Sequence, residues 1–138
     1  MVVMPPRGFI ATDTQGLQTT LGRNGSDFSA SIFGALLDAA EIVIWTDVDG
    51  VLSADPRLVP EAQVIAALSY NEAMELAYFG AKVIHPQTMA PAVHKRIPIW
   101  IKNTFAPEAA GTVIHDRTAP MPLVKGITTV ERIALVNL

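Results

Sequence analysis

Residues 21–50 read LGRNGSDFSASIFGALLDAAEIVIWTDVDG, a polar loop followed by two apolar-rich segments. Within it, Phe28–Ala40 carries apolar residues at the i, i+3, i+4 and i+7 spacing of an amphipathic helix, namely Ile32, Ala35, Leu36 and Ala39. Glu41–Trp45 (EIVIW) is a nearly continuous apolar run, typical of a buried strand in a parallel or mixed sheet. A polar loop, a helix and a buried strand in this order predict an α/β protein.

The elements on either side of this stretch fit the same class. Ser69 and Glu72 have the spacing of a capping box, which predicts a helix that ends before Gly80. Trp45 and Trp100 are expected in the core. The other predicted elements are, in chain order, a hairpin of Gly8–Thr12 and Leu17–Leu21, a loop over Val48–Pro60, helices Ser69–Phe79 and Gln87–Lys95, strands Pro98–Lys102 and Thr112–Ile114, and a strand ending Val124–Leu138.

Composition excludes several classes of protein. The formal net charge is −3 and no basic run occurs, so we expect no nucleic-acid partner. No apolar stretch reaches the roughly 20 residues of a membrane span, so no membrane partner is expected. The chain has no cysteine, which fits a cytoplasmic protein. Charged residues make up 17% of the chain, below an average of about 25%, so we expect part of the surface to be covered, either by a homo-oligomer interface or by a missing part of the chain.

The loop that enters the first helix is the first candidate site. A helix N-terminus presents free N–H groups and a partial positive charge. Arg23 suits a carboxylate and Asp27 suits an ammonium group, so together they could hold the two ends of an amino acid. The alternative is structural: Ser26 or Asp27 caps the helix, and Arg23 is a solvated side chain.

The second candidate is the end of the first buried strand. In open α/β sheets, ligands bind beyond the carboxyl ends of the strands. Thr46 and Asp47 emerge there, and Arg57 and Lys82 could neutralise phosphates. The alternative is a polar turn with surface charges. The three histidines lack metal-ligand spacing and no phosphate-loop motif occurs, so no metal site on the protein is predicted.

Four segments together resemble the aspartokinases, members of the amino-acid-kinase family. They occur in the expected order and spacing over about residues 8–114: LGRNGSD (Leu21–Asp27), WTDVDGVLSADPR (Trp45–Arg57), AMELAYFGAKVIHPQT (Ala73–Thr88) and PIWIKNT (Pro98–Thr104). The wording is most similar to the kinase part of bifunctional aspartokinase–homoserine dehydrogenases. The resemblance implies a three-layer αβα amino-acid-kinase sheet, here the truncated C-terminal lobe that binds ATP.

The resemblance also implies roles for individual residues. Arg23, Asn24, Gly25, Ser26 and Asp27 would bind L-aspartate, with Arg23 on a substrate carboxylate and Asp27 as the catalytic residue that organises the site. Thr46, Asp47, Arg57, Lys82 and Val83 would bind the nucleotide. Leu52 stands where many relatives have tyrosine, so a ring contact to the nucleotide is not expected there.

The implied reaction is transfer of the γ-phosphoryl group of ATP to the β-carboxylate of L-aspartate, giving 4-phospho-L-aspartate. Mg²⁺ would bridge the ATP phosphates, and no protein nucleophile is needed. The implied domains are residues 1–117 as kinase, 118–123 as linker and 124–138 as the start of a regulatory ACT domain. We expect the chain to be inactive alone, with NADP relevant only to a dehydrogenase domain outside it.

Two other readings of the function remain open. The chain could be a non-catalytic module that binds nucleotide or amino acid, or that mediates oligomerisation. It could also belong to another amino-acid kinase, one for acetylglutamate or glutamate, although the LGRNGSD wording argues against this.

Overall fold

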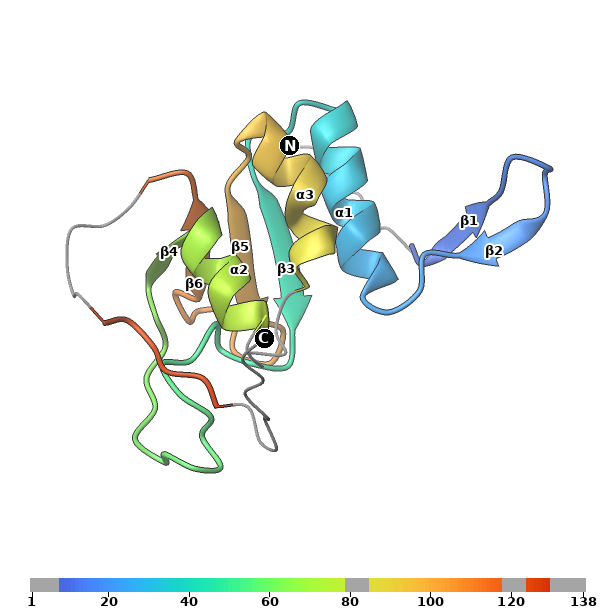
Figure 1. Ribbon diagram of the computed structural model, residues 1–138. Helices are drawn as coiled ribbons and strands as arrows, with labels where there is room; N and C mark the ends of the chain where they lie inside the picture. The colour runs from blue at the N-terminus through green and yellow to red at the C-terminus, as the bar shows by residue number, and fades with distance from the viewer. Residues whose placement is uncertain (1–7, 79–84, 118–123, 130–138) are drawn as a thin grey trace, which may run out of the picture.

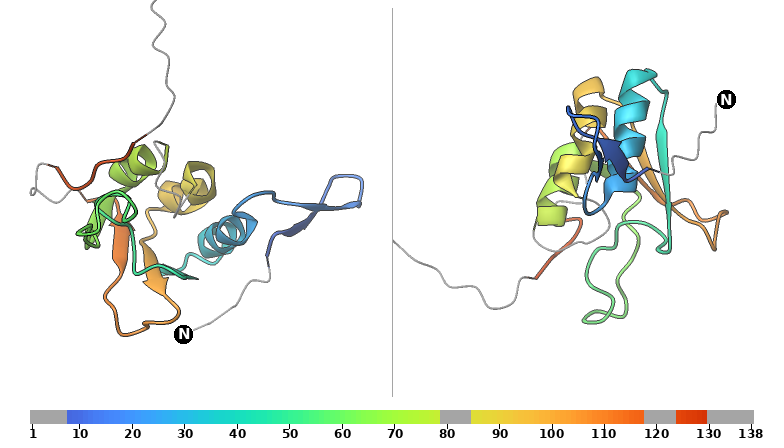
Figure 2. Two further views of the ribbon diagram at one scale, coloured as in Figure 1. Left: turned by 90° about the horizontal axis from the view of Figure 1, so that it is seen from below. Right: turned by 90° about the vertical axis from the view of Figure 1, so that its right-hand side faces the viewer.

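The computed structural model describes residues 8–78, 85–117 and 124–129 (Figure 1). The elements are, in chain order, β1 (Ile10–Thr12), β2 (Gln18–Thr20), α1 (Gly25–Leu36), β3 (Ile42–Thr46), β4 (Ala67–Ser69), α2 (Tyr70–Tyr78), α3 (Pro86–Lys95), β5 (Ile99–Asn103) and β6 (Thr112–His115). β1 and β2 form the predicted antiparallel hairpin, which stands apart from the other elements (Figure 2).

The four remaining strands form one mixed sheet in the order β3-β5-β6-β4. β3 and β5 are parallel, from Ile42 opposite Ile99 to Thr46 opposite Asn103. β5 and β6 are antiparallel, and β6 is parallel to β4. The prediction of a buried strand in a mixed α/β sheet is confirmed, whereas β4 was not predicted.

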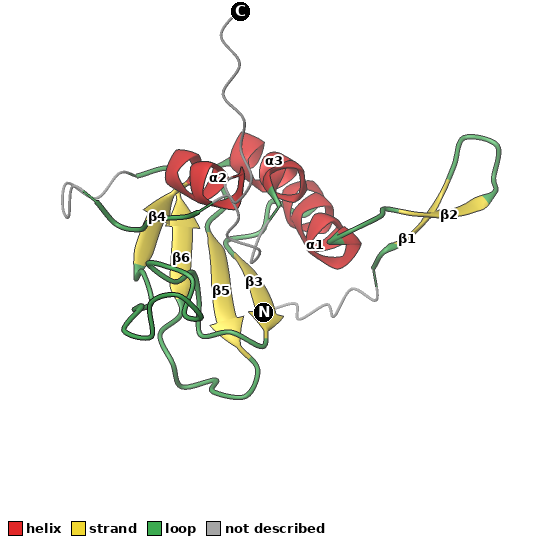
Figure 3. Cartoon of the chain, turned by 60° about the horizontal axis from the view of Figure 1, so that its bottom comes forward, coloured by secondary structure: helices red, strands yellow, loops and turns green. Residues whose placement is uncertain are grey.

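The described helices all cover the same face of this sheet (Figure 3). The core lies between the two layers, because alternate residues of the strands point toward the helices. Fully buried side chains from both layers fill it, including Leu68, Met89, Ile99, Ile101 and Ile114.

The bounds of α1 differ from the prediction at both ends. The helix begins at Gly25 rather than Phe28, with Asn24 as a left-handed N-cap residue. It ends at Leu36 rather than Ala40, because Asp38 adopts a left-handed conformation (φ 45°) and Ala39 donates its N–H back to the carbonyl of Gly34 at 2.9 Å. This six-to-one bond is the mark of a Schellman motif.

The buried face of α1 is also not the apolar stripe that was predicted. Ile32 and Ala35 are half-buried and Leu36 is 72% exposed, while Ser29, Ser31 and Gly34 are buried. Small residues occupy the contact face because the neighbouring elements approach closely. A side chain at Gly34 would overlap Ile42, and the Ser31 Oγ accepts the backbone N–H of Ala92 in α3 at 3.1 Å.

The other helices follow the sequence signals. In α2 the Ser69 Oγ accepts the Glu72 N–H at 3.2 Å, and Glu72 Oε2 accepts the Ser69 N–H at 2.7 Å, so the capping box is confirmed. Pro86 opens α3 as predicted. Gly80 and the apolar end of Val124–Leu138, residues 130–138, lie outside the described residues.

The two tryptophans were predicted to lie in the core, but neither side chain is buried there. Trp45 is 51% exposed, which contradicts the prediction, and Trp100 is half-buried. Both stand on the sheet face away from the described helices, since Ile42, Ile99 and Ile101 take the inward positions of β3 and β5. A continuous apolar run does not reveal which face of a strand is covered.

Candidate functional site

One end of the molecule gathers the chain segments that carry the candidate residues. In Figure 1, β3 and β5 run downward, and their carboxyl ends lie at the same end as the first turns of α1 and α3. Carboxyl ends of strands and amino ends of helices therefore meet there. This is where ligands bind in open α/β sheets, because the free helix N–H groups and the strand-end side chains face the same space.

The loop before α1 has a tightly fixed backbone. Gly22 (φ 76°) and Asn24 (φ 58°) both take left-handed conformations, which reverse the chain between β2 and α1. The Leu21 N–H donates to the Phe9 carbonyl at 2.7 Å, tying the loop to the hairpin. Gly25 is buried, and a Cβ there would lie 2.8 Å from the Phe9 Cβ. The glycine thus allows Phe9, which precedes β1, to pack against the start of the helix.

The N-terminus of α1 has no side-chain cap. The part of the structural alternative in which Ser26 or Asp27 caps this helix is therefore wrong, whereas Arg23 is exposed as that alternative expected. Both residues lie inside the first turn rather than ahead of it. The Gly25 N–H donates to the Gly22 carbonyl at 3.2 Å, and the N–H groups of Ser26 and Asp27 are the ones available to an anionic ligand. Arg23 is exposed beside them with no side-chain partner among the described residues.

Asp27 is half-buried in this first turn and has weak partners. The Asn24 Nδ2 donates to it at 3.4 Å and the Ser26 Oγ at 3.5 Å, both long for hydrogen bonds. Burial raises the pKa of Asp27, and this effect outweighs the lowering by the two hydrogen bonds. A partly desolvated carboxylate with no cation among the described residues is suited to bind a positively charged group.

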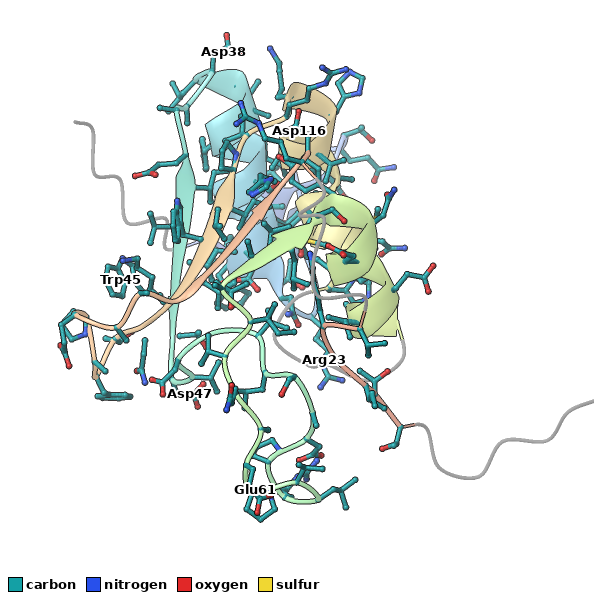
Figure 4. All side chains as sticks on the ribbon, turned by 90° about the vertical axis from the view of Figure 1, so that its left-hand side faces the viewer. Arg23, Asp38, Trp45, Asp47, Glu61 and Asp116 are labelled. Carbon is teal, nitrogen blue, oxygen red and sulfur yellow. The ribbon has the colours of Figure 1, made fainter. Side chains whose placement is uncertain are left out.

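Thr46 and Asp47 lie at the carboxyl end of β3, as predicted. The Thr46 Oγ1 donates to Asp47 Oδ1 at 3.2 Å, and Asp47 is exposed. Figure 4 shows Arg23 and Asp47 toward the same end of the molecule, whereas Asp38 and Asp116 lie at the opposite end. The structure thus brings the two candidate segments to one end.

The sequence reading missed a pair of polar residues beside them. Asn103, at the end of β5, donates from Nδ2 to Asp49 Oδ1 at 2.7 Å. The Thr104 N–H donates to the Thr46 carbonyl at 2.8 Å. These bonds join the ends of β3 and β5, and the strand pairing of Thr46 with Asn103 explains them. The signal in the sequence was a polar residue ending each of two apolar runs.

The 51–65 loop extends from the same end of the molecule as the carboxyl ends of β3 and β5 (Figure 1), and it contains Arg57. Its two legs pair through a bridge between Leu52 and Val64, and the Ser53 N–H donates to the Gln63 carbonyl at 2.8 Å. Arg57 is 79% exposed and forms an ion pair with Asp55 at 2.5 Å. Arg57 is therefore an exposed side chain that pairs with a residue of its own loop.

Two of the predicted nucleotide-binding residues lie outside the described residues, namely Lys82 and Val83. Among the residues that the structure describes, no three His, Cys, Asp or Glu side chains gather as a metal site. In the same part of the chain, no helix is long and apolar enough to cross a membrane.

Comparison with known proteins identifies the family. The model of the amino acid kinase family matches residues 1–103. The chain is 52% identical over 137 residues to a chloroplastic bifunctional aspartokinase/homoserine dehydrogenase 2 of Arabidopsis thaliana, covering 94% of this chain and 15% of that protein. It is also 52% identical over 131 residues to the bifunctional enzyme of Haemophilus influenzae, covering 94% and 16%.

Solved structures agree with this family. E. coli aspartokinase III in complex with aspartate and ADP superimposes with a TM-score of 0.81 at 43% identity, covering 86% of this chain and 27% of that one. Aspartate kinase of Clostridium acetobutylicum gives a TM-score of 0.82 at 39% identity, covering 88% and 28%.

The chain belongs to the amino acid kinase family, and the expected amino-acid-kinase fold is confirmed. Within that family, its similarity is to the aspartokinases, including the kinase part of the bifunctional enzymes. The chain spans about 15% of the length of the bifunctional relatives that it matches.

Proposed function

We propose that this chain forms part of an aspartate kinase, which transfers the γ-phosphoryl group of ATP to the β-carboxylate of L-aspartate and gives 4-phospho-L-aspartate. The observation that carries the proposal is the uncapped start of α1, with exposed Arg23 on one side and half-buried Asp27 in its first turn. These groups have the charges that an amino acid with two carboxylates and one ammonium group requires.

The amino-acid end of the reaction rests on the loop before α1. Arg23 holds a carboxylate of L-aspartate by a forked pair of hydrogen bonds, and the N–H group of Ser26 in the first turn of α1 adds to the positive field there. Asp27 attracts cations to the site and so organises the reacting groups. Asn24 positions the Asp27 carboxylate through its side-chain amide.

The nucleotide end rests on the strand terminus and the adjoining loop. Thr46 and Asp47 bind the nucleotide beyond β3, and Arg57 swings from its pair with Asp55 to reach the phosphates. Lys82 and Val83 complete this set. Mg²⁺ carried in with the ATP phosphates would supply positive charge that offsets the negative charge developing during transfer. The exposed carboxylate of Asp47 is an oxygen donor of the kind that Mg²⁺ prefers.

Phosphoryl transfer of this kind depends on positioning and charge neutralisation. The substrate supplies the nucleophile, its own β-carboxylate, whose oxygen forms the new bond to phosphorus while the bond to the β-phosphate oxygen of ATP breaks. No acid–base residue is required, since the attacking carboxylate is already ionised at neutral pH. The protein has to hold the two substrates in line and to neutralise the phosphates.

Calorimetric titration with ATP–Mg²⁺ tests the nucleotide end. We expect binding to the wild-type chain and a loss of about tenfold or more in affinity for Asp47→Ala, a typical effect of removing a charged contact. Asp116→Ala is the matched control, because Asp116 is an exposed carboxylate at the opposite end of the molecule (Figure 4). Equal losses in both variants, or no binding by the wild type, would count against the proposal.

A second candidate, an oligomerisation module, is favoured by the outer face of α1. Phe33, Leu36 and Leu37 are exposed there. Large apolar side chains rarely cluster on the surface of a monomer, so this group favours an interface. Sedimentation of the chain with and without Leu36→Glu tests this role. The homo-oligomer, the cytoplasmic location and an NADP-dependent domain outside this chain stay predictions.

A further inference from the structure

Residues 124–129 lie beyond the part of the chain that the family model matches, yet they pack onto three elements of the kinase domain. The Lys125 Nζ donates to Glu72 Oε2 of α2 at 2.8 Å and approaches the Ala67 carbonyl of β4 at 3.4 Å. The Ile127 N–H donates to the Ser53 carbonyl, in one leg of the 51–65 loop, at 2.8 Å. One short segment thus contacts β4, α2 and that loop.

The Lys125 side chain is 8% exposed, which is unusual for a lysine. A buried ammonium group costs free energy unless it is paired, so this position requires Glu72. The same oxygen of Glu72 also accepts the Ser69 N–H at 2.7 Å. Lys125 therefore binds the carboxylate that closes the capping box of α2, and the two contacts depend on each other.

Gly126 brings the segment into direct contact with the loop. A Cβ at this position would lie 3.2 Å from the Ser53 carbonyl, 3.3 Å from Ile65 and 3.4 Å from Leu76. The backbone of residue 126 thus fits between one leg of the 51–65 loop and α2. A larger residue there would push the segment off Ser53 and break the Ile127 hydrogen bond.

We propose that Lys125 is a positioning residue, which clamps segment 124–129 onto α2 and the 51–65 loop and so holds the loop that presents Arg57 to the nucleotide. The effect on nucleotide binding rests on the proposed function, whereas the clamp itself does not. Any displacement of segment 124–129 would then loosen the 51–65 loop, which gives the chain after β6 a route to the nucleotide end.

Hydrogen exchange on the full chain tests the clamp without any ligand. Lys125→Met keeps the length of the side chain and removes its charge, and Gly126→Val keeps Lys125 but crowds Ser53. Both should raise exchange in residues 51–65 and 69–76 and leave β3 and β5 protected. Lys95→Met is the matched control, because Lys95 forms an exposed ion pair with Asp38. No rise in 51–65, or the same rise in every strand, would overturn the proposal.

Binding measurements and a double-mutant cycle give the second readout. Lys125→Met should weaken ATP–Mg²⁺ binding about 5- to 10-fold, at the low end of allosteric couplings, and change L-aspartate binding less than about twofold. Glu72→Gln should have the same effect, and the double variant should be no weaker than either single one. Additive losses, or equal losses for both ligands, would overturn the clamp. If the wild type binds no ATP, the proposed function fails, and the exchange result alone decides the clamp.

Discussion

The Thr112 Oγ1 accepts the backbone N–H of Val51 at 2.8 Å, although 61 residues separate them in the chain. The same hydroxyl donates to the Ile65 carbonyl at 2.7 Å. Thr112 is the first residue of β6, and its fully buried side chain thus holds both ends of the 51–65 loop against that strand. Gly50 makes this contact possible, because a Cβ there would lie 2.5 Å from the hydroxyl.

Thr112→Val should destabilise the chain and loosen the loop. Valine has the same shape but leaves a buried N–H and a buried carbonyl without a partner, which costs about 1–3 kcal/mol each. The expected result in urea is a lower midpoint with an unchanged slope, together with weaker ATP–Mg²⁺ binding. Thr20→Val in the exposed strand β2 is the control. A variant as stable as the wild type would show that the loop does not depend on this hydroxyl.

Asp27→Asn should separate stability from ligand binding. Burial raises the pKa of Asp27 in the folded chain, so the ionised form costs the fold free energy at pH values above that pKa. The variant should therefore be at least as stable as the wild type at pH 7, with the difference shrinking as the pH falls and the wild-type carboxyl takes up its proton. L-aspartate binding should weaken about 10-fold or more, since a charged contact is lost.

The pH series is measured by urea unfolding, and binding by calorimetry, with Asp116→Asn as the exposed control. A variant that is less stable than the wild type at pH 7 would mean that the Asp27 carboxylate has a structural role, and unchanged L-aspartate affinity would remove it from the substrate site.

Glu72→Gln should have the opposite pH signature. Burial alone would raise the pKa of Glu72, but the hydrogen bonds from Lys125 and Ser69 outweigh it and hold the pKa below its ordinary value. The stabilisation is therefore complete above the unfolded-state pKa of about 4.3 and is lost as the pH falls through the lower folded-state pKa. The wild type should exceed the variant in unfolding free energy at neutral pH, and the gap should close in acid.

Glu75→Gln on the same helix is the control for this series, because Glu75 is exposed. A gap between wild type and Glu72→Gln that widens as the pH falls would contradict the ion pair with Lys125.

Local sequence signals predicted most of the framework. The hairpin, the capping box of α2, Pro86 at the start of α3 and the apolar runs of β3 and β5 all rest on interactions within a few residues. Long-range packing decided the rest. Small residues form the inner face of α1 because α3 and Ile42 approach so closely. The periodicity of hydrophobic residues does not predict this close approach.

The candidate site shows the same division. Arg23, Asp27, Thr46 and Asp47 stood out because their residue types follow strand ends or open a helix. The hydrogen bond between Asn103 and Asp49 and the hydrogen bonds of the Thr112 hydroxyl join segments that are distant in the sequence. Only the structure therefore reveals them. The role of Lys125 also depends on a distant partner, Glu72. In addition, a lone lysine in a sequence is usually exposed, so nothing in the sequence predicted that Lys125 is buried.

In the proposed reaction, the β-carboxylate of free L-aspartate is the phosphoryl acceptor. The most direct test traps the acyl phosphate with hydroxylamine, which converts it to a hydroxamate and phosphate, in the full-length kinase proposed here with ATP–Mg²⁺. We expect hydroxamate with L-aspartate but not with L-glutamate or N-acetyl-L-glutamate, and a loss of about 100-fold or more in Asp27→Asn, as for other electrostatic groups at reacting centres. No hydroxamate with L-aspartate, or equal amounts with L-glutamate, would contradict it.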